Sequence, residues 1–268
     1  MSGLALVGHQ FRFDQKAFWR NPASVFFTVM FPVLLLVIFG SIFGSSTVEI
    51  RGGHIDTDTY YVPAIISLSI ISSTMQSLAM SLVIAREDGR LKRGRGTPMP
   101  PFVFIAGRVG NSIVTAVLML ALLALIGGLI YGVHFPWDRI PAILLVLAIG
   151  AAAFSCLGIA LTAAIPTQDA AAPIVNFLLL PLYFLSGVFI PDDQLPSGII
   201  HFADVFPIRH FFLSFFDAYV PGGAHAVDWD HLLIVAIWGV GGLLLAIRFF
   251  RWTPRSGCGA APAAARGR

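Results

Sequence analysis

Six long runs of apolar residues dominate this sequence and limit what the chain can fold into. Each is long enough for the roughly 20 residues that a helix needs to cross the hydrocarbon core of a bilayer. They cover residues 23–43, 60–85, 102–131, 141–165, 170–190 and 231–250. Only 12% of the 268 residues are charged, about half the share of a typical soluble domain. The sequence therefore predicts an all-α integral membrane protein with six transmembrane helices and both termini on one side of the membrane.

Basic residues are distributed unevenly between the two sets of loops. With the N-terminus in the cytoplasm, 14 of the 17 lysines and arginines fall on the cytoplasmic side, and only Arg51, Arg139 and Arg209 fall outside. Under the same assignment, 10 of the 14 acidic residues lie outside. Because cytoplasmic loops are enriched in Lys and Arg, we expect a protein of the cytoplasmic membrane whose N- and C-termini both face the cytoplasm.

The two ends of the chain are less apolar. Residues 4–20 have the spacing of an amphipathic helix, with Phe11 and Phe18 on one face and basic residues beside it. We expect this N-terminal helix (1–21) to lie in the headgroup plane; a frayed soluble tail is the alternative. Residues 253–268 are rich in Gly, Ala, Pro and Arg, which predicts a disordered cytoplasmic tail. Residues 1–252 then form one transmembrane domain.

Four polar side chains interrupt the second apolar run. At the roughly 100° per residue of an α-helix, Ser69, Ser72, Ser73 and Gln76 fall within one sector of the helix surface. Polar groups at membrane depth avoid lipid and face other helices or a pathway. The stripe therefore predicts either helix packing or contact with a transported substrate.

The fifth apolar run leads into a stretch that cannot be one helix. Residues 181–210 turn at Leu185, Ser186 and Gly187 and then carry three prolines among aromatic residues. Proline fixes φ and removes a backbone donor, so a helix breaks there. Irregular backbone at membrane depth is tolerated only where protein or a water-filled cavity covers it. We expect residues 191–229 to form an extracellular re-entrant or interfacial segment; an ordinary surface loop is the alternative.

Residues that would carry catalysis or ion coupling are scarce. Ion-coupled transporters usually have buried carboxylates or histidines on the pathway, and the six runs carry almost no ionisable residue at mid-depth. The seven histidines form no HExxH set, the two cysteines have no metal-ligand spacing, and no GxxxxGK[ST] phosphate loop occurs. We therefore expect no catalytic residue, metal or cofactor on this chain. If a chain with these features uses ATP, the ATPase must be on another chain.

The spacing LSGxxxPxxxxP, followed by a third proline, resembles the hallmark of ABC-2 type membrane subunits, which are the permease halves of ABC exporters such as the daunorubicin-resistance type. The residues that carry this motif are Leu185, Ser186, Gly187, Pro191, Pro196 and Pro207. The resemblance extends over nearly the whole chain. It implies the ABC-2 exporter fold, with the segment after Pro191 acting as an outer gate.

The loop 86–101 is the densest charge cluster of the chain. It suits a positive-inside anchor, but the family has a pattern like ExGTLExLxxTP here, which forms a coupling helix seated in a groove of a cytoplasmic ATPase. The resemblance assigns this role to Arg86, Glu87, Gly89, Leu91, Thr97 and Pro98. Lys92 and Gly94 depart from the family pattern, which implies a shorter and looser helix. Of the two interpretations, the resemblance favours coupling over a pure anchor.

The resemblance also implies partners. Two permeases, identical or paired with a sibling, would sit on two separately encoded ATPase subunits that bind ATP and Mg, with spans one, two and five lining the interface and pathway. We expect export of a hydrophobic or amphiphilic cargo, drug-like or lipid, with membrane lipids around the chain and no nucleic acid as a partner. Two alternatives stay open: an exporter of polysaccharide or lipid-linked glycan, and a channel or scaffold protein that needs no ATPase.

Overall fold

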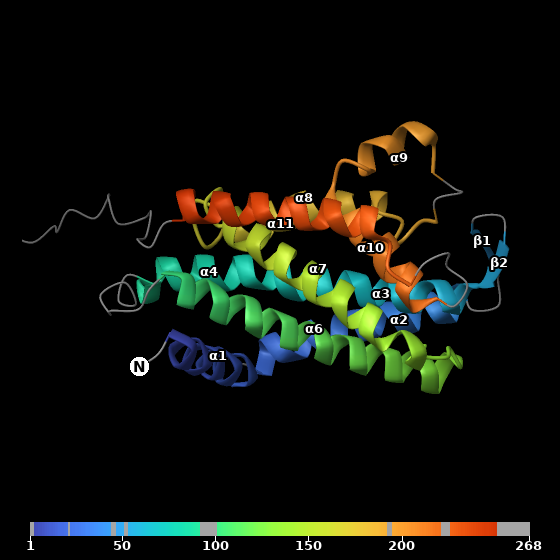
Figure 1. Cartoon of the computed structure of the whole chain (residues 1–268), viewed down its shortest axis with the longest axis horizontal. Helices are drawn as coiled ribbons and strands as arrows, with labels where there is room; N and C mark the ends of the chain where they lie inside the picture. Colours follow the sequence, from blue (N-terminus) through green and yellow to red (C-terminus); the bar gives the residue numbers. More distant parts are fainter. Residues whose placement is uncertain are drawn as a thin grey trace, which may run out of the picture.

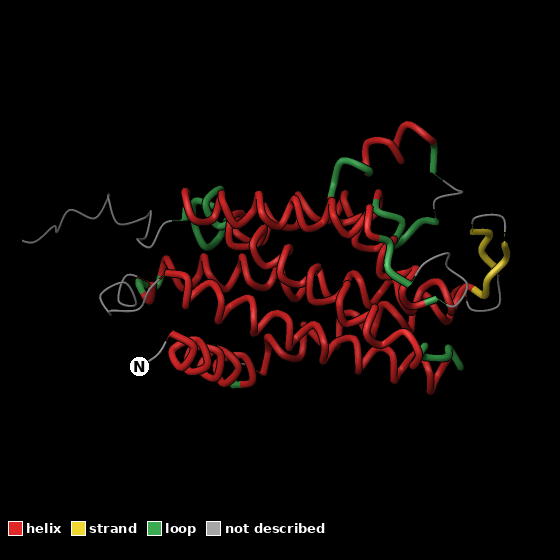
Figure 2. Tube along the Cα trace, viewed as in Figure 1, coloured by secondary structure: helices red, strands yellow, loops and turns green. Residues whose placement is uncertain are grey.

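The computed structural model describes residues 3–20, 22–43, 47–50, 53–91, 101–191, 195–220 and 226–250. Most of these residues are helical (Figure 2). The helices are α1 (Gly3–Trp19), α2 (Pro22–Phe43), α3 (Thr57–Ile71), α4 (Ser77–Glu87), α6 (Pro101–Tyr131), α7 (Ile140–Leu161), α8 (Ala171–Leu185), α9 (Ser197–Ala203), α10 (Pro207–Tyr219) and α11 (Trp229–Phe249). The remaining elements are a π-helical turn η1 (Ser72–Gln76), a 3-10 turn η2 (Trp137–Arg139) and the antiparallel strands β1 (Thr47–Ile50) and β2 (Gly53–Asp56).

Four helical stretches within the described residues are long and apolar enough to cross a membrane. They are Thr57–Glu87, Val103–Tyr131, Trp137–Leu161 and Trp229–Phe249, and they correspond to the second, third, fourth and sixth apolar runs of the sequence. α9 and α10 form a bent pair that counts as a fifth span if the two are taken as one. The described apolar part of α2, Thr28–Ile42, is shorter. An all-helical membrane protein is thus confirmed, with four or five candidate spans where the sequence predicts six.

The fifth apolar run is the clearest difference from the prediction. The sequence predicts a span over residues 170–190, but α8 covers only the 15 residues Ala171–Leu185. A helix of that length rises about 22 Å, which is less than the roughly 30 Å of the hydrocarbon core. The helix ends because Gly187 has a φ of +87°, a left-handed conformation that glycine adopts without steric cost and that terminates a right-handed helix.

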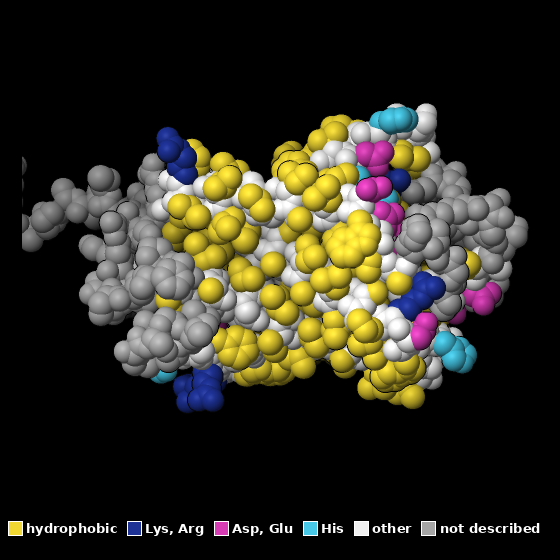
Figure 3. All heavy atoms as spheres, viewed as in Figure 1, with side chains coloured by type: hydrophobic (Ala, Val, Ile, Leu, Met, Phe, Trp, Pro, Cys, Tyr) yellow, Lys and Arg dark blue, Asp and Glu magenta, His cyan; other side chains and the backbone are white. Residues whose placement is uncertain are grey.

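The two ends of the bundle differ in charge. The start of α1, the end of α4, the start of α6 and the end of α11 lie together at the left of Figure 1. We call this the basic end; its described basic residues are Arg12, Lys16, Arg20, Arg86, Arg90, Arg108 and Arg248. The opposite, acidic end holds the β-hairpin and α9, and its described acidic side chains are Asp56, Asp58, Asp138, Asp204, Asp217, Asp228 and Asp230. Hydrophobic side chains cover the face between the two ends (Figure 3).

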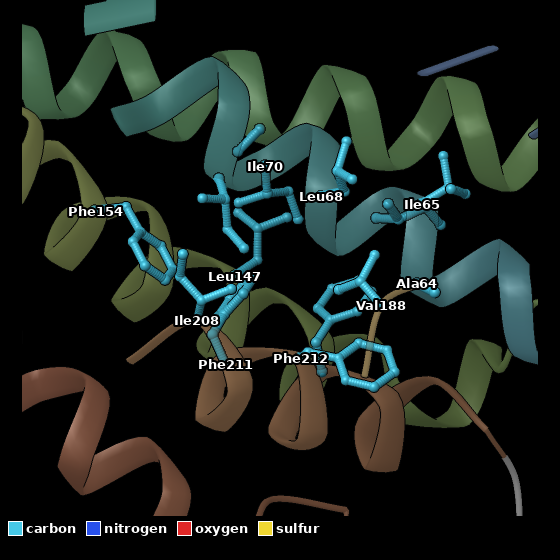
Figure 4. Close-up of a cluster of buried hydrophobic side chains, with 14 of the residues drawn as sticks. Ala64, Ile65, Leu68, Ile70, Leu147, Phe154, Val188, Ile208, Phe211 and Phe212 are labelled. Carbon is cyan, nitrogen blue, oxygen red and sulfur yellow. The ribbon is translucent and has the colours of Figure 1, made fainter. Parts of the chain in front are cut away.

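The helical stretch α3–η1–α4, here called the central span, runs through the middle of the bundle. Thirteen of the 15 residues of α3 are buried, because α2, α6, α7 and α10 pack around it. Figure 4 shows part of this buried cluster, with Ile65, Leu68 and Ile70 on α3, Leu147 on α7 and Phe211 on α10. An apolar helix that is buried all round is expected in the core of a bundle.

The two helices of the proline-broken segment differ in burial: α9 is mostly exposed, whereas α10 lies inside the protein. α9 and α10 meet at 96°, and 12 of the 13 residues of α10 are buried against α3, α7 and α11. α10 is therefore covered by protein, which is what a polar helix start at membrane depth requires, whereas Asp204 and Val205, between the two helices, are exposed. Residues 207–219 are a buried helix, so the surface-loop alternative does not hold for them.

Candidate functional site

Arg86 lies inside the chain at the basic end, with only 2% of its surface exposed. Its Nε donates to Glu87 Oε1 at 2.8 Å, and Nη1 donates to the Thr162 carbonyl at 2.9 Å. Nη2 donates to the carbonyls of Ile165 and Pro166 at 2.8 and 3.2 Å. These three carbonyls follow the C-terminus of α7, where acceptors lack helical partners and the helix dipole favours a cation. Arg86 therefore fixes the end of α4 to the α7–α8 loop.

The residues that follow end α4 in a tight turn, here called the coupling turn (86–91). Glu87 is the last residue of α4 and is partly buried, and Gly89 has a φ of +70°, a conformation that favours glycine. Leu91 is 5% exposed and packs in an apolar cluster with residues of α4, α6, α7 and α11. The structure brings these three predicted coupling residues together. Thr97 and Pro98 lie outside the described residues.

A buried ion pair joins α1 to α6, and sequence reasoning did not single it out. Asp14 Oδ2 on α1 lies 3.5 Å from Nε of Arg108 on α6, and both side chains are largely buried. The Arg108 guanidinium also lies 5.4 Å from the centre of the Phe104 ring, within cation–π range. Phe13 and Trp19 of α1 are exposed, which suits a helix in the headgroup plane. The N-terminal helix is thus attached to the body of the bundle.

The polar stripe of the second apolar run is divided by a change of helix type. Ser69 and Ser73 donate to carbonyls of their own helix at 2.8 and 3.1 Å. In η1 the backbone N–H of Ser77 bonds to the carbonyl of Ser72, five residues earlier. This wider turn changes the angle between successive side chains, so α-helical spacing does not describe the stripe as a whole.

The other two stripe residues contact α8. Ser72 Oγ lies 3.1 Å from the hydroxyl oxygen of Tyr183, and Gln76 Nε2 donates to Asn176 Oδ1 at 2.8 Å. Asn176 is exposed on the surface of the chain. Ser72 and Gln76 are therefore used in helix packing, and the amide pair also presents polar atoms at the surface of the bundle.

The LSG turn (Leu185, Ser186, Gly187) at the end of α8 is held by the start of the central span. Tyr60 Oη donates to the carbonyl of Gly187, and Tyr61 Oη donates to that of Phe189 at 3.3 Å. Ser186 is buried, and its hydroxyl donates to the Tyr183 carbonyl at 2.9 Å. Two tyrosine hydroxyls thus bind the irregular backbone that follows α8.

The three motif prolines lie at the boundaries of the segments that follow. Pro191 is buried just before residues 192–194, which are outside the described part of the chain. Pro196 is the N-cap residue of α9, and Pro207 stands in the first turn of α10. A missing N–H is without cost in the first turn of a helix, so these prolines begin α9 and α10 as well as interrupting what precedes them.

Side chains at the acidic end tie α10 to its neighbours. His210 is bonded through Nδ1 to Nδ1 of His231 on α11, and through Nε2 to the carbonyl of Asp204, both at 2.7 Å. A carbonyl only accepts, so Nε2 of His210 carries a proton and the two Nδ1 atoms share another. Arg209 pairs with Asp204 at 2.8 Å, and Arg139 of η2 donates to two carbonyls at the end of α10.

An apolar pocket of about 420 Å³ opens between α6 and α7 toward the acidic end. Its lining contains no polar side chain apart from the indole of a tryptophan. The lining residues are Val117, Leu120, Ala121, Ala124, Leu125, Gly128, Leu129, Val133, Phe135, Trp137, Ile140, Ile143 and Leu144. Such a surface suits hydrocarbon and offers few partners to sugar hydroxyls.

The family model described as ABC-2 type transporter matches residues 7–219. The match runs from α1 to the end of α10 and includes the coupling turn, the central span and the LSG turn. The chain belongs to the ABC-2 type transporter family. It is therefore a multi-pass protein of the cytoplasmic membrane, as the apolar runs and the charge distribution of the sequence predicted.

Three relatives show how far the similarity to this ABC-2 chain extends. The inner membrane transport permease YadH of Escherichia coli K12 is 28% identical over 63% of this chain and 65% of its own length, just under two thirds of that relative. The putative transport permease YvfS of Bacillus subtilis is 23% identical over 83% of this chain and 87% of its own length. Nodulation protein J of Rhizobium leguminosarum bv. viciae is 25% identical over 72% and 74%.

Family membership also bears on chemistry. An ABC-2 membrane subunit is not itself an ATPase and carries no cofactor. In the part of the chain that the structure describes, no three His, Cys, Asp or Glu side chains lie close enough to hold a metal ion.

Sequence reasoning missed several residues of this ABC-2 chain that now form contacts between helices: Tyr60, Tyr61, Asn176 and Tyr183. Each is a polar residue inside an apolar run, and that was a usable signal, because polar groups at membrane depth seek partners.

Proposed function

We propose that this ABC-2 permease is the membrane subunit of an exporter. A separate ATPase binds its basic end and drives a hydrophobic or amphiphilic molecule toward the acidic end. The observation that carries the proposal is the position of the coupling turn. Glu87 and Gly89, which match the family's coupling pattern, stand at the tip of the central span, which is buried among the other helices. A force applied there acts directly on the core of the bundle.

The distribution of charge supports a basic end that faces the cytoplasm. Arginines stand near the ends of α4 and α11, and aspartates stand where α3 and α11 begin. Cytoplasmic segments of membrane proteins are enriched in Lys and Arg. A cytoplasmic ATPase would then meet α1 and the coupling turn, which lie at the same end (Figure 1).

The surface of α8 supports pairing with a second permease, identical or a sibling. Asn176 is exposed beside Phe177 and Leu180, of which 84% and 56% are exposed. Amide groups at membrane depth are costly against lipid and are common between helices or along a pathway. A second subunit placed against α8 would cover the Gln76–Asn176 pair and use the apolar residues beside it.

The LSG turn supports a gate at the acidic end. It is the point where α8 stops short of the membrane thickness, and its backbone is held by side-chain hydroxyls rather than by helical hydrogen bonds. Such a turn can open by exchanging a few hydrogen bonds without unwinding a helix. In the proposed cycle, closure of the ATPase pair moves the coupling turn, and the segment from Gly187 through α10 opens toward the outer side.

The chemistry of the chain supports an apolar or amphiphilic cargo. The pocket between α6 and α7 is lined by hydrocarbon, whereas a glycan needs hydroxyl partners along its path. The Escherichia coli and Bacillus subtilis relatives are named as transport permeases, the second of them as a putative one, which agrees with a transport role.

Co-purification tests this proposal. The tagged permease is co-expressed with the ABC ATPase subunits of the same organism and isolated in lipid nanodiscs. A stable complex that the charge reversal Glu87→Lys disrupts, and that Asp138→Lys at the exposed acidic end leaves intact, is the expected result. Failure of the wild-type chain to bind an ATPase, together with ion conductance in planar bilayers, would support the channel alternative instead.

A further inference from the structure

The central span is bonded to α8 and its two flanking loops at three depths. At the basic end, Arg86 binds three carbonyls of the α7–α8 loop. In the middle, Ser72 and Gln76 contact side chains of α8. At the acidic end, Tyr60 and Tyr61 bind the backbone after α8. All three sets of contacts join the central span to α8 and its flanking loops. A displacement of the central span is therefore resisted by α8 along the whole length of the helix.

Of the three contacts, the one at the basic end needs the most hydrogen-bond acceptors. A buried guanidinium requires several acceptors, because its desolvation is costly unless its N–H groups are bonded. Arg86 meets this need with one carboxylate and three backbone carbonyls. A planar fork of N–H donors can bind carbonyls from different residues at once, which a lysine ammonium does less well. The geometry therefore depends on arginine and not on positive charge alone.

The positions of these carbonyls show which part of the chain a movement of Arg86 would reach. Thr162, Ile165 and Pro166 lie between the end of α7 and the start of α8, and Ile165 is fully buried. Arg86 itself is one residue before Glu87, at the start of the coupling turn. A movement of the turn therefore reaches the N-terminal side of α8 through hydrogen bonds, and α8 leads directly to the LSG turn.

We propose that Arg86 is a positioning residue that transmits movement of the coupling turn to α8 and the LSG turn, acting within the chain and not at the surface that binds the ATPase. This inference rests on the proposed function, because it specifies how the motion imposed by the ATPase reaches the outer gate. It also separates two roles within the coupling turn: Glu87 and Gly89 receive the ATPase, and Arg86 carries the motion inward.

The experiment uses the full-length permease in nanodiscs with its ATPase. It compares amide hydrogen exchange at residues 162–170 and 185–191 with and without a non-hydrolysable ATP analogue. The variants are Arg86→Gln and Arg86→Lys, and the control is Arg248→Gln, which removes an exposed arginine at the same end of the bundle. ATP hydrolysis and ATPase binding are measured on the same samples.

In the wild type and the Arg248 control, the nucleotide should change exchange at 185–191. Arg86→Gln should still bind the ATPase and hydrolyse ATP, but the nucleotide-dependent change at 185–191 should be lost, and Arg86→Lys should recover part of it. Without nucleotide, exchange at 162–170 should rise about tenfold in Arg86→Gln, because charged hydrogen bonds that hold the loop are gone. If Arg86 had only a structural role, Arg86→Gln would alter the exchange measured without nucleotide but would leave the nucleotide-dependent change at 185–191 intact.

The experiment distinguishes a failure of the proposed function from a failure of the role proposed for Arg86. If the wild-type chain binds no ATPase, the proposed function itself is wrong. If it does, and Arg86→Gln shows the wild-type nucleotide response at 185–191, the transmission role is wrong while the exporter remains. Should Arg86→Gln fail to fold, Arg86→Lys decides alone: unchanged exchange at 162–170 or a full nucleotide response in that variant would overturn the inference.

Discussion

Replacing Gly158 with alanine should push apart the two helical segments on which the middle of the bundle depends. α7 approaches η1 there backbone to backbone. A Cβ at position 158 would lie 2.7 Å from the carbonyl oxygen of Met75 and 3.1 Å from its Cα. Both are main-chain atoms, so no side chain can rotate away, and η1 itself must move. Because Ser72 and Gln76 of η1 contact α8, the change should loosen those contacts as well.

The size of the effect follows from two opposing terms. Adding a methyl group to a close-packed contact costs about 1–3 kcal/mol, while alanine is favoured over glycine in a helix by up to about 1 kcal/mol. Gly241→Ala in α11 is the control that separates the packing cost from the helix-propensity gain. A Cβ at position 241 would meet no atom within 4 Å, so this variant carries the propensity gain alone. Gly241→Ala should match or slightly exceed the wild type in free energy of unfolding. Gly158→Ala should fall about 1–3 kcal/mol below that control.

Equilibrium unfolding in lipid–detergent micelles, followed by circular dichroism at a fixed micelle composition, measures this difference. Hydrogen exchange of residues 72–77 provides a local readout and should increase only in Gly158→Ala. Equal free energies of unfolding for the two alanine variants, with unchanged exchange in η1, would refute the close contact between α7 and η1.

Three further outcomes are expected. Replacing Glu87 by Gln together with Leu91 by Ala should abolish transport and stimulated ATP hydrolysis while the chain still inserts into the membrane. The single variant Leu91→Ala is the stability control. Because Leu91 is buried, this variant should lower the free energy of unfolding by about 2–4 kcal/mol. Surviving transport in the double variant would remove the coupling role. Gly187→Leu should reduce transport, since a side chain at a φ of +87° costs about 1–2 kcal/mol, and normal export would leave the LSG turn a purely structural feature. His231→Phe should lower the free energy of unfolding by about 1–3 kcal/mol, because it leaves Nδ1 of the buried His210 without its partner; an unchanged free energy of unfolding would contradict the bond between the two rings.

The sequence was informative where a local pattern determines structure. Apolar runs of sufficient length predicted the central span, α6, α7 and α11, since hydrophobic length alone defines a candidate span. Proline positions predicted the break around α9 and α10, because proline cannot continue a helix. The fifth run was overestimated, since its hydrophobicity continues to Ile190 while the helix ends at Leu185. Hydropathy does not register the left-handed glycine that ends it.

Contacts between distant residues could not be predicted in the same way. Arg86 and its carbonyl acceptors are 76 to 80 residues apart, and Tyr60 and Gly187 are 127 apart. Neither periodicity nor motif spacing encodes which loop will face which helix. Leu91 illustrates the same limit, because it matches a coupling pattern yet packs inside its own chain. The π-helical turn η1 likewise breaks the α-helical geometry from which the serine stripe was inferred.

The proposed exporter function is tested most directly by measuring ATP hydrolysis by the permease purified with its ATPase subunit and reconstituted in lipid. The assay is run with and without a panel of amphiphiles. We expect a stable complex whose ATP hydrolysis is stimulated by at least one amphiphile and is unaffected by soluble glycans. A wild-type permease that associates with no ATPase, and instead conducts ions across a bilayer, would contradict the proposed function.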